Sequence, residues 1–340
     1  MKRTILYVVL AFIVAPIFVS CYQSHKKKLD LAYALVESRP DSALALMKHI
    51  DQEGLSKEEM AKYALTYYIA QDKSGLDLDN DSLIRIAYDW YEGHQEDSLY
   101  VLCLNYMGKF YLLVDSMEQA KSCLEKAYFI SDSLHKINVK RLVLDKLIEV
   151  EEQLEPYKAL RYAKDMLKMY DSMANVTIYN KVAARLRLGE NFFYVDSLQH
   201  ALEEERKAYR MAMKAGDSNL LSYVRQNLAS TFEEMGEKDS CLYYARLAYD
   251  LNAANRFSCL LTFASAYISV DSLNQAFSLL NQALPKTAED RYSVFYFQSQ
   301  AAMKAQDFKS AKSFSDSAYH YLEDMYRIAL QGKAAYYTSF

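Results

Sequence analysis

The sequence repeats one pair of positions six times, and this repeat constrains the fold more than any other feature. The later position of each pair is small in every repeat, and its members are Ala120, Ala159, Ala201, Cys241, Ala276 and Ala311. Twelve residues earlier stand Gly108, Leu147, Gly189, Ala229, Ala264 and Ser299, so successive repeats are 39, 42, 40, 35 and 35 residues apart. An internal period of roughly 20 to 50 residues indicates an array of stacked supersecondary units.

The stretch from Leu104 to Ala127 shows what one unit contains. A first predicted helix carries, on one face, Leu104, Met107, Gly108 and Tyr111. After an interruption at Asp115-Ser116, a second predicted helix carries Ala120, Leu124 and Ala127. Apolar residues three and four apart mark the buried face of a helix. Small residues at Gly108 and Ala120 let the two helices approach closely, so the unit is a helix pair.

This stretch resembles the tetratricopeptide repeat (TPR) at all seven signature positions of that family, whose unit is an antiparallel helix pair of about 34 residues. The resemblance implies an all-α fold, a right-handed α-solenoid of about seven to eight TPR-like antiparallel helix pairs. The residues expected to pack the pairs are Gly108, Tyr111, Ala120, Ala127, Gly189, Ala201, Ala208, Ala229, Ala264, Ala276 and Ala311.

Composition supports a folded helical chain. Hydrophobic residues make up 51% and charged residues 25% of the 340 residues, which excludes disorder. Only 8 glycines and 4 prolines leave little room for β-hairpins. A net charge of −4 argues against a nucleic-acid-binding surface on this segment.

The first 20 residues are expected to be a lipoprotein signal peptide. Met1-Lys2-Arg3 is a basic start, and an apolar stretch too short for a comfortable membrane span follows it. Residues 18–21, Phe-Val-Ser-Cys, resemble the lipobox of bacterial lipoproteins, in which Cys21 would be lipidated and would anchor the chain. Plain secretion and an uncleaved anchor helix are the alternatives. The basic run Lys26-Lys27-Lys28 favours a protein that faces the periplasm of the bacterial cell envelope.

The rest of the chain divides into three expected parts: a tether over 21–28, atypical TPR-like helices over 29–95, and tandem repeats over 96–335. The blocks at residues 39–51, 56–73 and 78–94 resemble the extracytoplasmic repeat region of TPR lipoproteins and membrane regulators of the Bacteroidetes type. In many of those regulators, a transmembrane helix and a DNA-binding domain follow the repeats.

The dipeptide Asp-Ser occurs eleven times and often precedes a predicted helix. Four copies stand shortly before the small position of a second helix: those at 115–116, 196–197 and 271–272 precede it by four or five residues, and the one at 239–240 by one or two. An Asp or Ser oxygen can accept the free amides of a first helical turn, so we expect these pairs to be N-caps.

No catalytic or metal-binding pattern stands out, so neither an enzyme nor a cofactor is expected. The six histidines are scattered, with no pair four residues apart, and there is no Gly-rich phosphate loop. Cys103 and Cys123 lie on opposite helices of one pair, where an oxidising compartment would allow a disulfide, with free buried thiols as the alternative.

A partner-binding surface is the remaining expectation. In stacked TPR pairs the first helices line a concave groove, and here they are rich in aromatic residues. The candidate groove residues are Tyr67, Tyr106, Phe110, Arg185, Phe193, Tyr223, Arg225, Tyr292 and Tyr296. Core filling is the alternative role for the aromatic residues. Arg187 also falls on a first helix and, like the other two arginines, could meet a peptide carboxylate.

Two functions follow from this surface. The first is a non-enzymatic, membrane-anchored scaffold that binds an unknown protein or peptide. The second is the sensory repeat region of a longer transmembrane transcriptional regulator. A glycan-binding lipoprotein of the SusD-like class is a third possibility, but the repeats here lack the large insertions of that class.

Overall fold

The computed structural model describes residues 26–338, except for 77, 79–80, 95–97, 135–136 and 252. Cys21 and the predicted signal peptide lie outside these residues. The part of the chain that the structure describes contains helices and no strands. A helix over residues 26–35 begins inside the predicted tether. The helices that follow are α2 (Pro40–Met47), α3 (Lys57–Lys73), α4 (Ser82–Tyr91), α5 (Ser98–Leu113), α6 (Met117–Ser133), α7 (Ile137–Leu154), α8 (Pro156–Ser172), α9 (Ile178–Tyr194), α10 (Leu198–Ala215), α11 (Ser218–Glu234), α12 (Lys238–Tyr249), α13 (Arg256–Ser269), α14 (Leu273–Leu280), α15 (Ala288–Lys304) and α16 (Phe308–Thr338).

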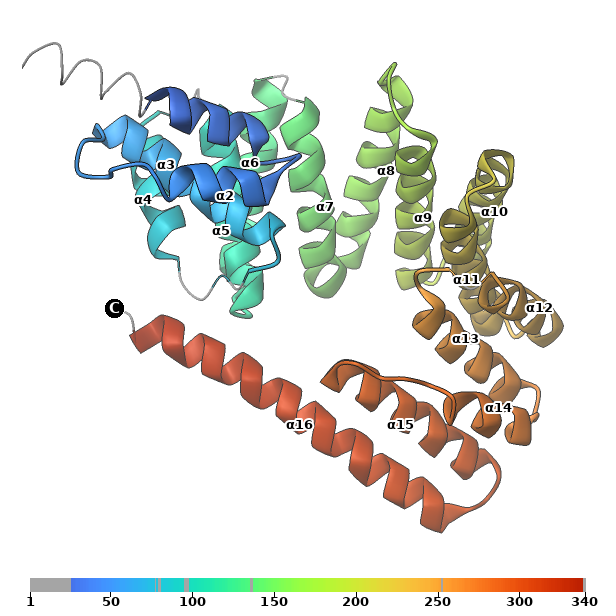
Figure 1. Ribbon diagram of the computed structural model, residues 1–340. Coiled ribbons are helices and arrows are strands. Elements are labelled where there is room, and N and C mark those ends of the chain that lie inside the picture. Colours follow the sequence, from blue (N-terminus) through green and yellow to red (C-terminus); the bar gives the residue numbers. More distant parts are fainter. Residues whose placement is uncertain are drawn as a thin grey trace, which may run out of the picture. The chain divides into compact units, whose positions relative to one another are not determined.

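Consecutive helices pack as pairs (Figure 1), which confirms the predicted all-α repeat fold. Among the described residues, those up to Lys146 and those from Ala335 onward form unit 1, and Leu147–Ala334 form unit 2. Within each unit, first helices also contact the first helix of the next pair, as α3 does α5 and as α9 does α11. This arrangement of nearest-neighbour contacts is typical of a repeat array.

Five of the pairs are connected by the same backbone turn. A residue with a left-handed backbone stands between the two helices, with φ of 54° to 74°, at Asp115, Asp196, Gly236, Asp271 and Gln306. The next amide then bonds back five residues, as Ser197 N–H does to the Phe192 carbonyl at 2.8 Å. This is the Schellman motif, which satisfies the last carbonyls of the first helix. The turn therefore reverses the chain in the same way at each of these five positions.

The prediction that Asp-Ser pairs cap the second helices with their side chains is wrong at all four sites. Ser116, Ser197 and Ser272 occupy the N-cap positions of α6, α10 and α14, but none of these side chains accepts a cap hydrogen bond. Their ψ angles are 58° to 69°, whereas a capping residue needs an extended backbone to place its oxygen over the first turn. The Schellman turn sets this backbone. At the fourth site Asp239 and Ser240 lie inside α12.

Side-chain caps occur where the backbone is extended. Asp217 has ψ of 115°, and its carboxylate accepts the Leu220 amide at 2.9 Å. Ser56 and Thr287 begin α3 and α15 with capping boxes, and their ψ angles are 165° and 170°. These caps lie before first helices, where the chain arrives from the preceding pair.

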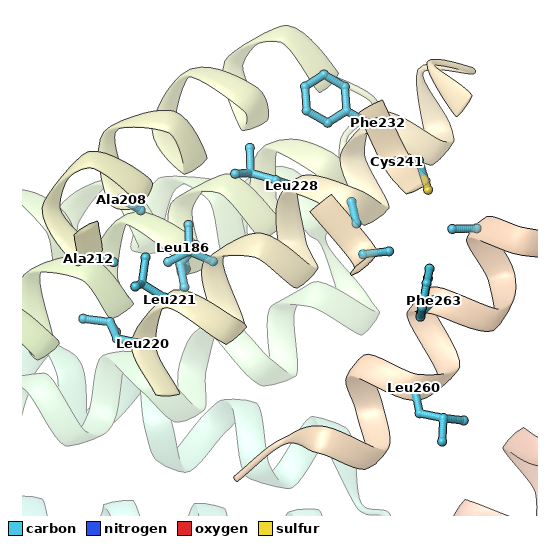
Figure 2. Packing of buried hydrophobic residues seen from close by; sticks show 14 of the residues in the cluster. Leu186, Ala208, Ala212, Leu220, Leu221, Leu228, Phe232, Cys241, Leu260 and Phe263 are labelled. Atoms are coloured by element: carbon cyan, nitrogen blue, oxygen red, sulfur yellow. The ribbon is translucent and has the colours of Figure 1, made fainter. Parts of the chain in front are cut away.

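The core of unit 2 is continuous from α9 to α14. Figure 2 shows part of it, with Leu228 and Phe232 of α11, Cys241 of α12 and Phe263 of α13. The Phe232 ring stacks on Tyr244 of the second helix in the same pair, with 5.5 Å between ring centroids. Burying one such apolar side chain contributes about 1.5–3 kcal/mol, so packing between pairs holds the array together.

Candidate functional site

The residues expected to pack the helix pairs are buried, with one exception. Gly108, Ala120, Ala127, Gly189, Ala201, Ala208, Ala229, Ala264, Ala276 and Ala311 are buried, and Tyr111 is half-buried. A Cβ atom built on Gly108 would lie 2.6 Å from Leu124 Cγ, so α5 and α6 meet there with no room for a side chain. A Cβ atom on Gly189 would lie 3.2 Å from Glu205 Cγ.

In unit 2, the outward sides of the first helices form one polar and aromatic surface, which we call the first-helix face. On α9 it comprises Tyr179, Arg187, Glu190 and Tyr194, and on the next two first helices Tyr223, Gln226, Asn227 and Ser258. The four α9 residues are spaced by eight, three and four positions, which places them on one side of the helix. Tyr194 is 57% and Tyr223 43% exposed, so both rings are available to a partner.

Hydrogen bonds between successive first helices hold the polar side chains of this face in place. Asn191 of α9 donates to Glu152 Oε1 of α7 at 2.9 Å, and the Arg187 guanidinium lies 3.3 Å from Glu152 Oε2. Asn227 of α11 donates to Glu190 Oε1 of α9 at 3.0 Å.

This ladder of hydrogen-bonded amide and carboxylate side chains continues from α11 toward α13. Gln226 donates to the Ser258 hydroxyl and accepts from Asn255 Nδ2 at 3.0 Å. These bonds order the amide and carboxylate groups before any partner arrives, which lowers the entropic cost of binding.

The carboxylates near the α9 end of the face perturb one another and the nearby tyrosine. Burial raises the pKa of Glu152, while the Arg187 charge and the Asn191 hydrogen bond oppose that rise. Partial burial raises the pKa of Tyr194, and the Glu152 and Glu190 carboxylates raise it further. Tyr194 therefore keeps its phenolic proton near neutral pH and can donate a hydrogen bond.

Several predicted groove residues do not reach this surface. Tyr106 and Phe110 are 5% and 1% exposed and pack in the core of unit 1, so no partner can contact them without rearrangement. Tyr67 and Phe193 are half-buried. The alternative role in core filling therefore applies to Tyr106 and Phe110.

The two predicted groove arginines turn toward second helices. Arg185 Nη1 donates to Glu204 Oε2 of α10 at 2.8 Å, and Arg225 Nη1 donates to the Leu247 carbonyl of α12 at 3.0 Å. In two consecutive pairs, an arginine of the first helix thus bonds the second helix of the same pair, which indicates a structural role. Arg187, two residues after Arg185, is the arginine on the first-helix face.

Two tyrosines from the predicted groove lie on α15. Tyr296 is exposed, and Tyr292 is half-buried and stacks on it with 6.0 Å between ring centroids. Together with Tyr223, Tyr296 is a predicted residue that the structure leaves open to solvent.

Sequence reasoning missed the amide and carboxylate ladder. Glu152, Glu190, Asn191, Gln226 and Asn227 have partners 29 to 39 residues away, close to the repeat period. A search for complementary polar residues one period apart would have found them.

The described residues hold neither a candidate metal site nor a disulfide. No three His, Cys, Asp or Glu residues there gather closely enough to hold a metal ion. No disulfide joins Cys103 and Cys123, and burial raises the pKa of the Cys123 thiol to about 11. No helix within the same residues combines the length and hydropathy needed to cross a bilayer.

No protein-family model and no curated sequence matches the chain. Solved structures do share its fold. A Rap protein complexed with competence and sporulation factor is 15% identical with a TM-score of 0.62, over 92% of this chain and 94% of that one. NprR in complex with its cognate peptide NprX is 15% identical with a TM-score of 0.59, over 85% and 86%.

A further structural neighbour is a signal-transduction ATPase with numerous domains (STAND) from Pyrococcus horikoshii, which has a tetratricopeptide repeat sensor. It is 12% identical with a TM-score of 0.60, over 90% of this chain and 47% of that one. These likenesses place the chain among TPR-like helical repeat structures.

Proposed function

We propose that this chain is a non-enzymatic interaction module that binds a peptide or protein segment along the first-helix face of unit 2. The observation that carries the proposal is the combination of exposed rings at Tyr194 and Tyr223 with a pre-ordered ladder of amides and carboxylates. Tyrosine supplies large contact area with a polar tip and is enriched at binding hot spots. Side-chain amides offer both a donor and an acceptor, which matches a peptide backbone.

The structural neighbours support a peptide as the partner. The Rap protein was solved with competence and sporulation factor and NprR with its cognate peptide NprX, and the alignment with each spans most of this chain. Their identity to this chain is too low to carry a binding site across, so the proposed site rests on the residues described above.

The test is a peptide selected by display against the full chain, with its affinity then measured by fluorescence anisotropy. Tyr194→Ala with Tyr223→Ala should weaken binding by more than about ten-fold, because each removes a hot-spot-sized contact. The matched control is Tyr157→Ala with Tyr243→Ala, since both tyrosines are exposed but lie on the second helices α8 and α12.

The proposal fails if the selected peptides bind the Tyr194 and Tyr223 variant as tightly as the wild type. It also fails if the control pair loses as much affinity, because the rings would then act through stability or non-specific contact.

The alternative function is the sensory repeat region of a longer regulator. The STAND protein favours it, because its repeats belong to a sensor and the match covers only 47% of that chain. An antibody against unit 2 distinguishes the two functions in the native cell. A band near the mass of this chain supports the scaffold, and a clearly larger integral membrane band supports the sensor.

We also propose that Cys21 carries a lipid that anchors the module in the cell envelope, facing the periplasm. The support is the lipobox-like stretch over residues 18–21. Labelled palmitate should enter the wild type and not Cys21→Ser, and equal labelling of both would rule out this anchor.

A further inference from the structure

One position on the second helices, eight residues after the small position, lies where the following helix pair stacks. Eight residues after the small position stand Tyr128 on α6, Tyr209 on α10, Tyr249 on α12 and Tyr319 on α16. In the first three cases a cationic side chain from the following first helix lies over the ring. The three pairs are Lys140 over Tyr128 at 4.7 Å, Arg225 over Tyr209 at 5.8 Å, and Arg256 over Tyr249 at 4.3 Å.

The same register on α16 is open. Tyr319 is 60% exposed, and Leu322, three residues later, is 44% exposed. On the three earlier second helices that extend to this register, α6, α8 and α10, the residues equivalent to Leu322 are buried, namely Ser131, Tyr170 and Ala212. α16 therefore presents a face that earlier pairs use for stacking, with none of the described residues stacked on it as a following pair.

The open face is a continuous stripe of Phe308, Ser315, Tyr319, Leu322 and Tyr326, which we call the terminal stripe. Its spacings of seven, four, three and four residues keep all five on one side of the helix, and all five are exposed. Four of the five are large and apolar or aromatic. A helix face that a repeat array leaves open to solvent has to be polar for solubility, and this exposed stripe is not polar.

We propose that the terminal stripe is a homodimer interface, on which α16 of a second copy packs in the antiparallel direction. The stripe lies in the register that internal second helices use for stacking. There, the first helix of the following pair supplies an apolar face and a cation. α16 carries both, since Lys312, which forms an ion pair with Asp316 on its own helix at 2.8 Å, is highly exposed beside the stripe. A two-fold interface requires one self-complementary surface, and two-fold dimers are the commonest assembly of identical chains.

The order of residues along the stripe is self-complementary. In an antiparallel pair centred at residue 317, Phe308 faces Tyr326 of the other copy, and Ser315 faces Tyr319. The ring of Tyr319 thereby meets the smallest residue of the stripe. Lys312 comes beside Leu322 and the adjacent Glu323, which pairs a cation with a carboxylate at each end.

The test measures the mass of the full chain in solution by sedimentation velocity, from low to high micromolar concentration. The mass of any detergent bound to the lipid anchor is subtracted. The wild type should approach twice the mass of one chain. Tyr319→Asp and Leu322→Asp should each raise the dimer dissociation constant more than about ten-fold, because symmetry places the new charge twice in a desolvated interface. Tyr243→Asp, on the exposed side of α12, is the matched control and should leave the dimer intact.

A second measurement tests the antiparallel register. Chains carrying Ser315→Cys, mixed with chains carrying Tyr319→Cys, should form an oxidised heterodimer, whereas Ser313→Cys on another side of α16 should not. A wild type that stays monomeric at every concentration overturns the proposal. So does a dimer that survives both aspartate substitutions, since it would use another surface. Unchanged far-UV circular dichroism spectra will show that the variants, whose substituted residues are exposed, are folded.

Discussion

At the scale of single residues, the turn inside each helix pair shows how a polar residue replaces glycine. Gly236 occupies the left-handed position of one turn, and aspartates occupy it at 115, 196 and 271. A side chain in this conformation clashes with the following carbonyl, and Asp tolerates it better than most residues. The aspartates of these Asp-Ser pairs therefore serve the turn through their backbone.

Asp196→Gly should raise the free energy of unfolding by up to about 1 kcal/mol, because relief of the left-handed strain exceeds the added entropy of the unfolded chain. For a unit of this size the melting temperature should rise by about 2–4 °C per kcal/mol, measured by circular dichroism. Gly236→Ala, which adds a side chain at the left-handed position of another turn, should lower the melting temperature. A fall in melting temperature for Asp196→Gly would show that its side chain stabilises the turn.

A second prediction concerns the pH dependence of stability. Glu205 is buried on α10, and burial raises the pKa of its carboxyl from 4.5 to about 7, although the Thr231 hydroxyl donates to it at 2.8 Å. Between these values the folded chain holds a proton that the unfolded chain has released. The free energy of unfolding should therefore fall as the pH rises from 4.5 to 7, by an amount on the order of 3 kcal/mol, and level off above.

Glu205→Gln should remove this slope, as measured by urea unfolding at several pH values. Glu203→Gln, an exposed neighbour on the same helix, should leave the slope unchanged. A slope that persists in Glu205→Gln would assign the pH dependence to another group.

At the scale of secondary-structure elements, the distance between two paired helices depends on one residue in each. α5 and α6 approach at Gly108, where the fully buried Leu124 occupies the space of a missing side chain. Glycine within a helix costs about 0.5–1 kcal/mol relative to alanine, so close packing is the reason for a glycine here.

Gly108→Ala should destabilise the chain by about 1–3 kcal/mol despite its better helix propensity, because the new Cβ would lie 2.6 Å from Cγ of the fully buried Leu124 and force the packing there to shift. Gly189→Ala should cost less, since its nearest neighbour is a glutamate side chain 3.2 Å from the new Cβ. Denaturant unfolding measures both. Leu124→Ala combined with Gly108→Ala should cost less than the sum of the single changes, and simple additivity would contradict the proposed clash.

At the scale of the whole molecule, contacts between neighbouring pairs replace a single central core. In such an array a local change spreads mainly to adjacent pairs. The division of the chain into two compact units is consistent with this behaviour.

Hydrogen exchange of Gly108→Ala tests this locality. Protection should fall in α5 and α6, which make the altered contact, and should stay at its wild-type value in α11 and α12 of the other unit. An equal loss of protection in every helix would mean that the chain opens as one cooperative structure.

Much of the fold was predictable because helices are local structures. The spacing of apolar and small residues at 108, 111, 120 and 127 indicated a helix pair, and its recurrence indicated the array. The side-chain caps were mispredicted because Asp-Ser is equally compatible with a cap and with a left-handed turn. The choice between them depends on the backbone that the two packed helices impose.

The sequence by itself determined that this protein consists of repeated helix pairs, since a period of about 3.6 residues and small residues at fixed positions require no knowledge of distant contacts. Only the tertiary structure decided which side chains a partner can reach. Arg185 and Arg187 are two residues apart, yet one binds the second helix of its pair and the other lies on the first-helix face. Tyr249 and Tyr319 share a register, yet a following helix covers only the first. Exposure depends on which elements stack on a residue, and that is a property of the assembled array.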